Sequence, residues 1–144
     1  MEKSDRFVLD RFLKQQKLYY PTALSELRKG QKQTHWMWFI FPQIDGLGSS
    51  EMAVEYAIKS EKEARQYLAH AVLGARLAEC AQALLAVEGR TAYQIMGKPD
   101  YLKLQSCMTL FAYISEPDSI FQRVLDKYYA GERDSKTIWL LQGN

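Results

Sequence analysis

The sequence predicts an all-α fold: a compact multihelical single domain of about eight helices, interrupted by one irregular aromatic-rich segment. Apolar residues recur at helical spacing almost throughout the chain, and the alternation typical of strands is nearly absent. The 144 residues, of which 47% are hydrophobic and 25% charged, have the length and balance of an ordinary globular domain. Because the chain contains no interior repeat or linker, residues 1–144 are expected to form one domain.

The first third of the chain predicts two helices followed by an irregular stretch. An apolar stripe over residues 7–18 indicates the first helix, and Pro21 is expected to end it. Thr22 is then placed to cap a second, short helix, which Gly30 would stop in a left-handed turn. Residues 31–48 form the least helical part of the sequence, because Pro42, Gly46 and Gly48 interrupt it.

Capping residues divide the middle of the chain into further helices. Residues 49–50 offer serine caps for a helix that runs through Ile58. Ser60 and Glu63 predict a capping box, in which each side chain accepts a hydrogen bond from the backbone amide of the other residue. A longer helix follows and ends at Gly89.

Three more helices and a short turn are expected after residue 90. Thr91 caps a short helix that Gly97 closes, and Pro99 suits the first turn of the next helix. Pro117 and Asp118 open another, and Asp134 or Ser135 caps the last. The apolar side chains expected to be buried in the core are Phe12, Leu77, Leu84, Leu102, Met108, Leu110, Phe111 and Leu125.

Charge and composition restrict the classes of partner. Nineteen Lys and Arg against 17 Asp and Glu give a net charge of +2, which is too small to indicate a nucleic-acid partner. The longest apolar run, Trp36 to Pro42, is far shorter than the ~20 residues of a membrane span, and the charged N-terminus has no signal-peptide core. We therefore expect a cytoplasmic protein with no membrane or nucleic-acid partner, while its oligomeric state is not predicted.

Motifs for metals and cofactors are missing from the sequence. Cys80 and Cys107 lie in apolar helical patterns without C-x-x-C or His spacing, which is typical of buried thiols that act as small hydrophobes. The glycines are scattered and form no phosphate-binding loop, and there is no His-Glu-x-x-His motif or dense carboxylate cluster. We expect neither a metal nor a cofactor.

The segment 34–43 is the first candidate for a site. It concentrates two of the three tryptophans, Trp36 and Trp38, between His35 and Gln43. Aromatic faces beside an imidazole and an amide can stack a planar ring and bind its edge. The alternative is an apolar plug in the core, with His35 in a structural role.

The second candidate is the helix that begins near Pro99. Lys103, Ser106 and Thr109 follow one another at i+3 spacing, so they share a stripe that could hold a phosphate or carboxylate. Amides at the start of the helix would add donors. A Ser–Lys nucleophilic pair and a plain solvated stripe are the alternatives.

Nearly the whole chain resembles the domain-of-unknown-function family 1810, whose members are sometimes labelled calpastatin without a mechanistic basis. The longest matching motifs are His35-Trp36-Met37-Trp38-Phe39-Ile40-Phe41-Pro42-Gln43, Gly46-Leu47-Gly48, Leu102-Lys103-Leu104, Met108-Thr109-Leu110-Phe111 and Tyr128-Tyr129-Ala130-Gly131. The resemblance implies a small helical fold but no activity or cofactor. A distant likeness to the NAD/ADP-ribose-associated family of small helical proteins, which contains N-glycosidic hydrolases, is an analogy of fold alone.

The leading functional hypothesis is binding or hydrolysis of a nucleotide-like or ADP-ribose-like small molecule, and the sequence leaves open whether the protein is an enzyme. The ligand-binding candidates are His35, Trp36, Trp38, Gln43, Lys103, Ser106 and Thr109. Hydrolysis of an N-glycosidic bond would need a carboxylate, for which the candidates are Glu55, Glu63, Asp100 and Asp134. The alternative is a non-catalytic protein-interaction module that docks its partner through the aromatic segment 35–43.

Overall fold

The structure, a computed structural model, describes residues 3–143 and the side chains of residues 8–143. Within that range it contains nine α-helices and no strand, and 66% of the chain is helical, so the predicted all-α fold is confirmed. The helices are α1 (Lys3–Lys29), α2 (Met37–Ile40), α3 (Glu51–Glu55), α4 (Glu61–Ala69), α5 (Leu73–Ala86), α6 (Ala92–Met96), α7 (Asp100–Tyr113), α8 (Ile120–Tyr129) and α9 (Ser135–Leu141). None of the helices in this range is both long and apolar enough to span a membrane.

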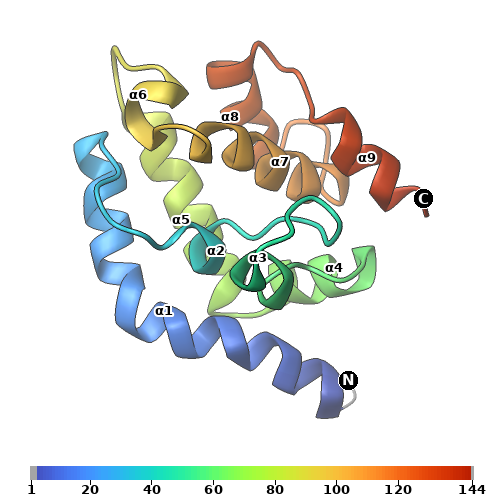
Figure 1. The fold of residues 1–144 in the computed structure, drawn as a ribbon. Helices are drawn as coiled ribbons and strands as arrows, with labels where there is room; N and C mark the ends of the chain where they lie inside the picture. The colour runs from blue at the N-terminus through green and yellow to red at the C-terminus, as the bar shows by residue number, and fades with distance from the viewer. Residues whose placement is uncertain (1–2, 144) are drawn as a thin grey trace.

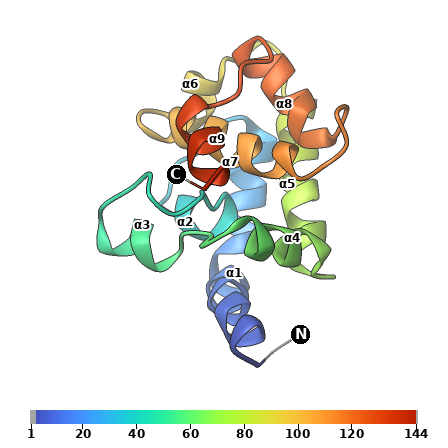
Figure 2. The same cartoon turned by 90° about the vertical axis from the view of Figure 1, so that its right-hand side faces the viewer.

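Helix α5 lies at the centre of the packing. It contacts α1, α4 and α8, while α7 packs against α8 and carries α6 and α9 (Figure 1). The segment between α1 and α4, which contains the short helices α2 and α3, crosses in front of α5 and below α7 in this view. In the view turned by 90°, the N-terminal arm of α1 extends away from the rest of the molecule (Figure 2).

The prediction that Pro21 separates two helices is wrong, because α1 continues through it to Lys29. A proline inside a helix removes one backbone hydrogen bond and costs about 3 kcal/mol. Ala23, Leu24 and Leu27 are buried beyond it, and burying a leucine contributes about 1.5–3 kcal/mol, so packing outweighs this cost. Figure 1 shows two arms of α1 that meet at an angle, as expected for a helix with an internal proline.

Local capping signals were mostly predicted correctly. Ser50 and Asp134 cap α3 and α9, and Thr91 forms a complete capping box with Gln94 at the start of α6. At α4, Ser60 Oγ accepts the amide of Glu63 as expected. The returning bond differs, however, because the Glu63 carboxylate accepts the amide of Lys59 at 2.7 Å instead of that of Ser60. Helix α8 is capped by Ser119, just after the predicted start.

Helix α3 is shorter than the sequence suggested. Helix α3 ends at Glu55, before Ile58, because the amide of Ile58 donates to Gln43 O and its carbonyl accepts from Asp45 N, both at 2.8 Å. These bonds form part of an isolated parallel bridge between Ile44 and Ile58. The helix therefore ends early because residue 58 is hydrogen-bonded to the loop that contains residues 43–45.

The predicted core is confirmed except at one position. Seven of the eight expected side chains are at most 1% exposed: Phe12, Leu77, Leu84, Met108, Leu110, Phe111 and Leu125. Leu102 is 46% exposed, because the first turn of α7 lies at the surface and the buried run of that helix begins at Leu104. Cys80 and Cys107 are buried as expected; burial raises the pKa of Cys80 to about 12 and that of Cys107 well above its usual value.

The junction between α4 and α5 is tight. A Cβ atom at Gly74 would overlap the carbonyl oxygen of Leu68, so only glycine allows this close approach. His70 Nδ1 accepts hydrogen bonds from the amides of Val72 (3.1 Å) and Leu73 (3.2 Å), so this histidine caps the start of α5.

Candidate functional site

The carboxylate of Glu26, near the end of α1, fixes the segment that leads into the aromatic residues. Its Oε1 accepts hydrogen bonds from the amides of Gln33 (2.8 Å) and Thr34 (3.1 Å) and from Trp36 Nε1 (2.8 Å). Thr34 Oγ1 donates to Oε2 at 2.8 Å. Burial alone would raise the pKa of Glu26, but these hydrogen bonds outweigh it and lower the pKa to about 2. Glu26 is therefore a charged anchor for the buried Trp36.

Lys32 ties this segment to α6 and to the start of α7. Its backbone amide donates to Ile95 O at 2.7 Å. Its Nζ lies 3.0 Å from Asp100 Oδ2, donates to Thr34 O at 2.7 Å, and lies 5.0 Å from the centre of the Trp36 ring. Only 7% of the Lys32 side chain is exposed, so its amine is held in one place.

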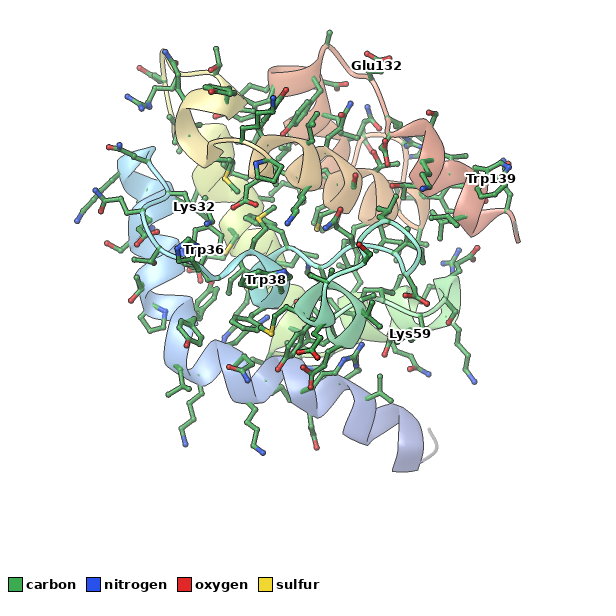
Figure 3. The ribbon with its side chains drawn as sticks, viewed as in Figure 1. Lys32, Trp36, Trp38, Lys59, Glu132 and Trp139 are labelled. Carbon is green, nitrogen blue, oxygen red and sulfur yellow. The ribbon has the colours of Figure 1, made fainter. Side chains whose placement is uncertain are left out.

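A cavity of about 290 Å³ lies between these two parts of the chain. The residues that line it come from the segment after α1 and from the α6–α7 junction: Lys32, Gln33, His35, Met37, Trp38, Met96, Lys98, Pro99 and Asp100. Figure 3 shows Lys32, Trp36 and Trp38 in succession along the segment that leads from α1 to α3. The site is thus formed by residues about 60 positions apart in the sequence.

Lys103 lies one turn along α7 from Asp100. Its Nζ is 3.9 Å from Asp100 Oδ1, which is longer than a hydrogen bond, and 6.0 Å from the centre of the Trp38 ring. About a third of the Lys103 side chain is exposed, 32%. The aromatic segment and the α7 helix, the two segments singled out in the sequence, therefore meet at this cavity.

The other residues predicted for the aromatic side of the site are divided among three places. His35 lines the cavity together with Trp38. Trp36 is completely buried behind it, where its ring packs against Lys32 and its indole nitrogen is bound by Glu26. Gln43 lies instead at a cavity of only about 20 Å³, which Trp38 also lines.

Ser106 and Thr109 face α9 and do not line this cavity. Ser106 Oγ donates to Asp134 Oδ2 at 3.1 Å, and Thr109 Oγ1 accepts from the amide of Asp134 at 2.9 Å. Asp134 in turn accepts from the amide of Thr137 at 3.2 Å and caps α9. The two hydroxyls of the predicted i+3 stripe thus hold α9 against α7, and the candidate acid Asp134 is a helix cap.

Two amides in the first turn of α7, which the sequence suggested as donors for a ligand, are bonded within the chain. The amide of Tyr101 donates to Gly97 O at 2.8 Å, and that of Leu102 donates to Pro99 O at 3.0 Å. The peptide bond between Lys98 and Pro99 is cis. Helix α7 contributes two charged side chains: Asp100, which lines the cavity, and Lys103, which lies at the edge of the cavity.

The remaining candidate acids lie near α1. Glu63 is buried and paired with Arg11, whose Nη1 lies 3.2 Å from Glu63 Oε2. Arg11 also donates to the carbonyls of Glu55 (2.9 Å) and Ala57 (2.7 Å), so it ties α1 to the chain around α3. Glu55 is exposed at an open groove of about 780 Å³ between α1 and α3. Charged surface side chains make up most of this groove's lining, and neither tryptophan of the aromatic segment contributes to it.

Sequence reasoning missed Glu26 as an anchor and Lys98 as a lining residue. Glu26 could have been found, because it falls beside the apolar positions of its helix, where a carboxylate needs several hydrogen-bond donors. Lys98 carried no such signal, since a lysine beside a proline is common in surface turns. Its position follows only from the approach of two distant segments.

Comparison with known proteins identifies relatives without a described activity. The family model described as "Protein of unknown function (DUF1810)" matches residues 6–141. The chain is similar to the conserved hypothetical protein Rv1873 from Mycobacterium tuberculosis, whose crystal structure was determined at 1.38 Å. The two are 48% identical, the match covers 95% of this chain and 98% of that one, and the TM-score is 0.92. No curated protein matches the chain. The protein therefore belongs to the DUF1810 family of proteins of unknown function.

Proposed function

We propose that the protein binds a small nucleotide-like molecule, with a planar ring and an anionic group, in the cavity between residues 32–38 and 96–103. The observation that carries this proposal is the position of Lys103, whose amine lies 6.0 Å from the ring of Trp38 at the edge of the cavity. A cation beside an aromatic face can bind the anionic part of a ligand while the indole stacks on its ring.

The charges at the cavity support an anionic ligand. Lys32 and Lys98 line it, and Lys103 lies at its edge, against the single carboxylate of Asp100 among the lining residues. Lys32 compensates Asp100 at 3.0 Å, so the charges of Lys98 and Lys103 remain for a ligand. Lys98 is exposed and Lys103 partly exposed, and their side chains can therefore turn towards an incoming anion.

The size and apolar lining support a single planar ring. Met37 and Met96 line the cavity together with Trp38, which provides flexible apolar contacts around an aromatic face. A volume of about 290 Å³ is just below the ~300–1,000 Å³ typical of ligand pockets. This favours a ligand of mononucleotide size over a dinucleotide.

The contacts support binding more than hydrolysis. Cleavage of an N-glycosidic bond needs a carboxylate that stabilises the oxocarbenium-like centre or activates water. Asp100 is the only one of the four candidate acids that lines this cavity, and one of its oxygens is held by Lys32. Glu63 is engaged by Arg11 and Asp134 by α9, and Glu55 lines another groove.

The alternative, docking of a protein partner through the aromatic segment 35–43, has less support. Docking needs an open apolar patch, but five side chains of this segment are at most 4% exposed: Trp36, Met37, Phe39, Ile40 and Phe41. Their burial in the core is what a stable helical domain of this size requires.

Titration with adenosine 5′-monophosphate (AMP) tests the proposal. We expect AMP to quench the fluorescence of Trp38. The fluorescence of Trp139, which lies on α9 at the right-hand edge of Figure 3, should not change. Lys103→Ala should weaken binding by about 1.5–3 kcal/mol, the contribution of a hydrogen bond to a charged group. Lys136→Ala, which removes an exposed lysine of α9, is the matched control. Equal affinity of the wild type and Lys103→Ala at both low and high salt would contradict the proposal.

A further inference from the structure

The negative charge of the Asp100 carboxylate would repel an anion bound in the cavity, so its presence there needs an explanation. Its Oδ2 is paired with Lys32, but its Oδ1 is 3.9 Å from Lys103 Nζ, too far for a hydrogen bond. The side chain is 18% exposed and lines the cavity. Asp100 therefore keeps the capacity to accept hydrogen bonds from a bound molecule.

We infer that Asp100 accepts hydrogen bonds from the vicinal hydroxyls of a ribose, so that the ligand is a ribonucleoside monophosphate. This inference rests on the proposed function and specifies its ligand. Carboxylates perform this task in dinucleotide-binding folds, where an acidic residue binds ribose hydroxyls. The inference makes Asp100 a residue that determines specificity.

Electrostatics require a hydrogen-bond donor at this position. A phosphate close to the Asp100 carboxylate would be repelled unless a donor group lay between them. Lys103 lies near one residue from each wall of the cavity, since its Nζ is 3.9 Å from Asp100 Oδ1 and 6.0 Å from the centre of the Trp38 ring. A Lys103 side chain that binds a phosphate leaves Asp100 Oδ1, to which it makes no hydrogen bond, available to a ribose hydroxyl.

Each group of such a ligand has a candidate partner at the cavity. In a nucleoside monophosphate, the sugar lies between the base and the phosphate. Trp38 offers a face for the base, Lys103 and Lys98 offer charge for the phosphate, and Asp100 lies next to Lys103. Because Asp100 lines the same cavity as Trp38 and Lys98, its carboxylate is within the part of the chain that a bound sugar would face.

The test compares AMP with 2′,3′-dideoxy-AMP, which lacks only the two hydroxyls, by calorimetric titration. The wild type should bind AMP at least about ten-fold more tightly, the effect of a hydrogen bond to a charged acceptor. Asp100→Asn should reduce this preference to less than about three-fold and leave the affinity for 2′,3′-dideoxy-AMP unchanged or higher. Asp118→Asn, which alters an exposed aspartate before α8, should keep the wild-type preference.

Each alternative result overturns a defined statement. Equal binding of both nucleotides by the wild type, weakened for both in Lys103→Ala, overturns the role of Asp100 and leaves the proposed function standing. A preference for AMP over inosine 5′-monophosphate that Asp100→Asn abolishes, without discrimination against the dideoxy compound, assigns Asp100 to the base and also overturns the inference. Failure of the wild type to bind either nucleotide overturns both proposals. If Asp100→Asn does not fold, the wild-type comparison decides.

Discussion

Two carboxylates flank the aromatic segment, and they are held in opposite ways. Glu26 is buried and accepts four hydrogen bonds from neutral donors, two of them backbone amides. Asp100 is partly exposed and faces two lysines, only one of them at hydrogen-bond distance. Both residues carry the same charge, but they differ in the number and kind of their hydrogen-bond donors. This difference separates Glu26, which holds the fold, from Asp100, for which we propose a ligand.

Removal of Glu26 should have the largest effect on stability. Glu26→Ala leaves the buried Trp36 Nε1 and the partly buried amides of Gln33 and Thr34 without their acceptor, and an unsatisfied buried group costs about 1–3 kcal/mol. We expect the free energy of unfolding, measured in urea, to fall by about 3–5 kcal/mol. Glu116→Ala, at an exposed loop position, is the control and should change it by less than about 0.5 kcal/mol. A loss below about 1 kcal/mol for Glu26→Ala would contradict the prediction that Glu26, unlike Asp100, is a structural anchor.

Acid should weaken the Glu26 anchor selectively. The pKa of Glu26 is about 2 in the folded protein against a usual value of 4.5, so its contribution is complete above pH 4.5 and is lost as the pH falls towards 2. The size of this loss is on the order of 3 kcal/mol. Because other carboxylates also titrate in this range, the measurement is the difference in unfolding free energy between the wild type and Glu26→Gln. A difference that does not narrow between pH 5 and pH 2 would exclude the ionised anchor.

The pair of Lys32 and Asp100 should contribute less than Glu26. Lys32→Met keeps a long unbranched side chain but removes the amine that contacts Thr34 O, Asp100 and the Trp36 ring, and we expect a loss of about 1–2 kcal/mol. In the double variant Lys32→Met/Asp100→Asn, the loss should be smaller than the sum of the single losses, because neither charge is left unpaired. Strict additivity in a thermal and urea double-mutant cycle would show that the two residues do not interact.

Lys103 should contribute least to stability. Its contact with Asp100 is 3.9 Å long and partly exposed, and exposed pairs at i,i+3 spacing contribute only ~0.2–0.5 kcal/mol. Lys103→Ala should therefore leave the unfolding free energy within about 0.5 kcal/mol of the wild type while it weakens AMP binding. A large loss of stability would place Lys103 with Glu26 among the structural charges.

The sequence was informative where both partners of an interaction lie within one turn of helix. Ser50, Thr91 and Asp134 were recognised as caps because each accepts an amide three residues along the chain. The continuation of α1 through Pro21 could not be read this way, since it depends on burial of Leu24 and its neighbours by distant helices.

The candidate site shows the same limit. His35, Trp38, Asp100 and Lys103 were singled out from the sequence, and all lie in or beside one cavity. Periodicity assigned Lys103, Ser106 and Thr109 to one stripe of α7, but it does not reveal which part of the molecule each side chain meets. Only the structure shows that α9 covers Ser106 and Thr109.

The double attachment of Lys32 has a consequence for the kinetics of the ligand binding that we propose. Its amide is bonded to Ile95 O and its amine to Asp100, so the two walls of the cavity are fixed to each other before any ligand arrives. A preformed cavity imposes no conformational delay on association. Binding should then follow a single exponential whose rate rises linearly with ligand concentration, and differences in affinity between related nucleotides should reside mainly in their dissociation rates.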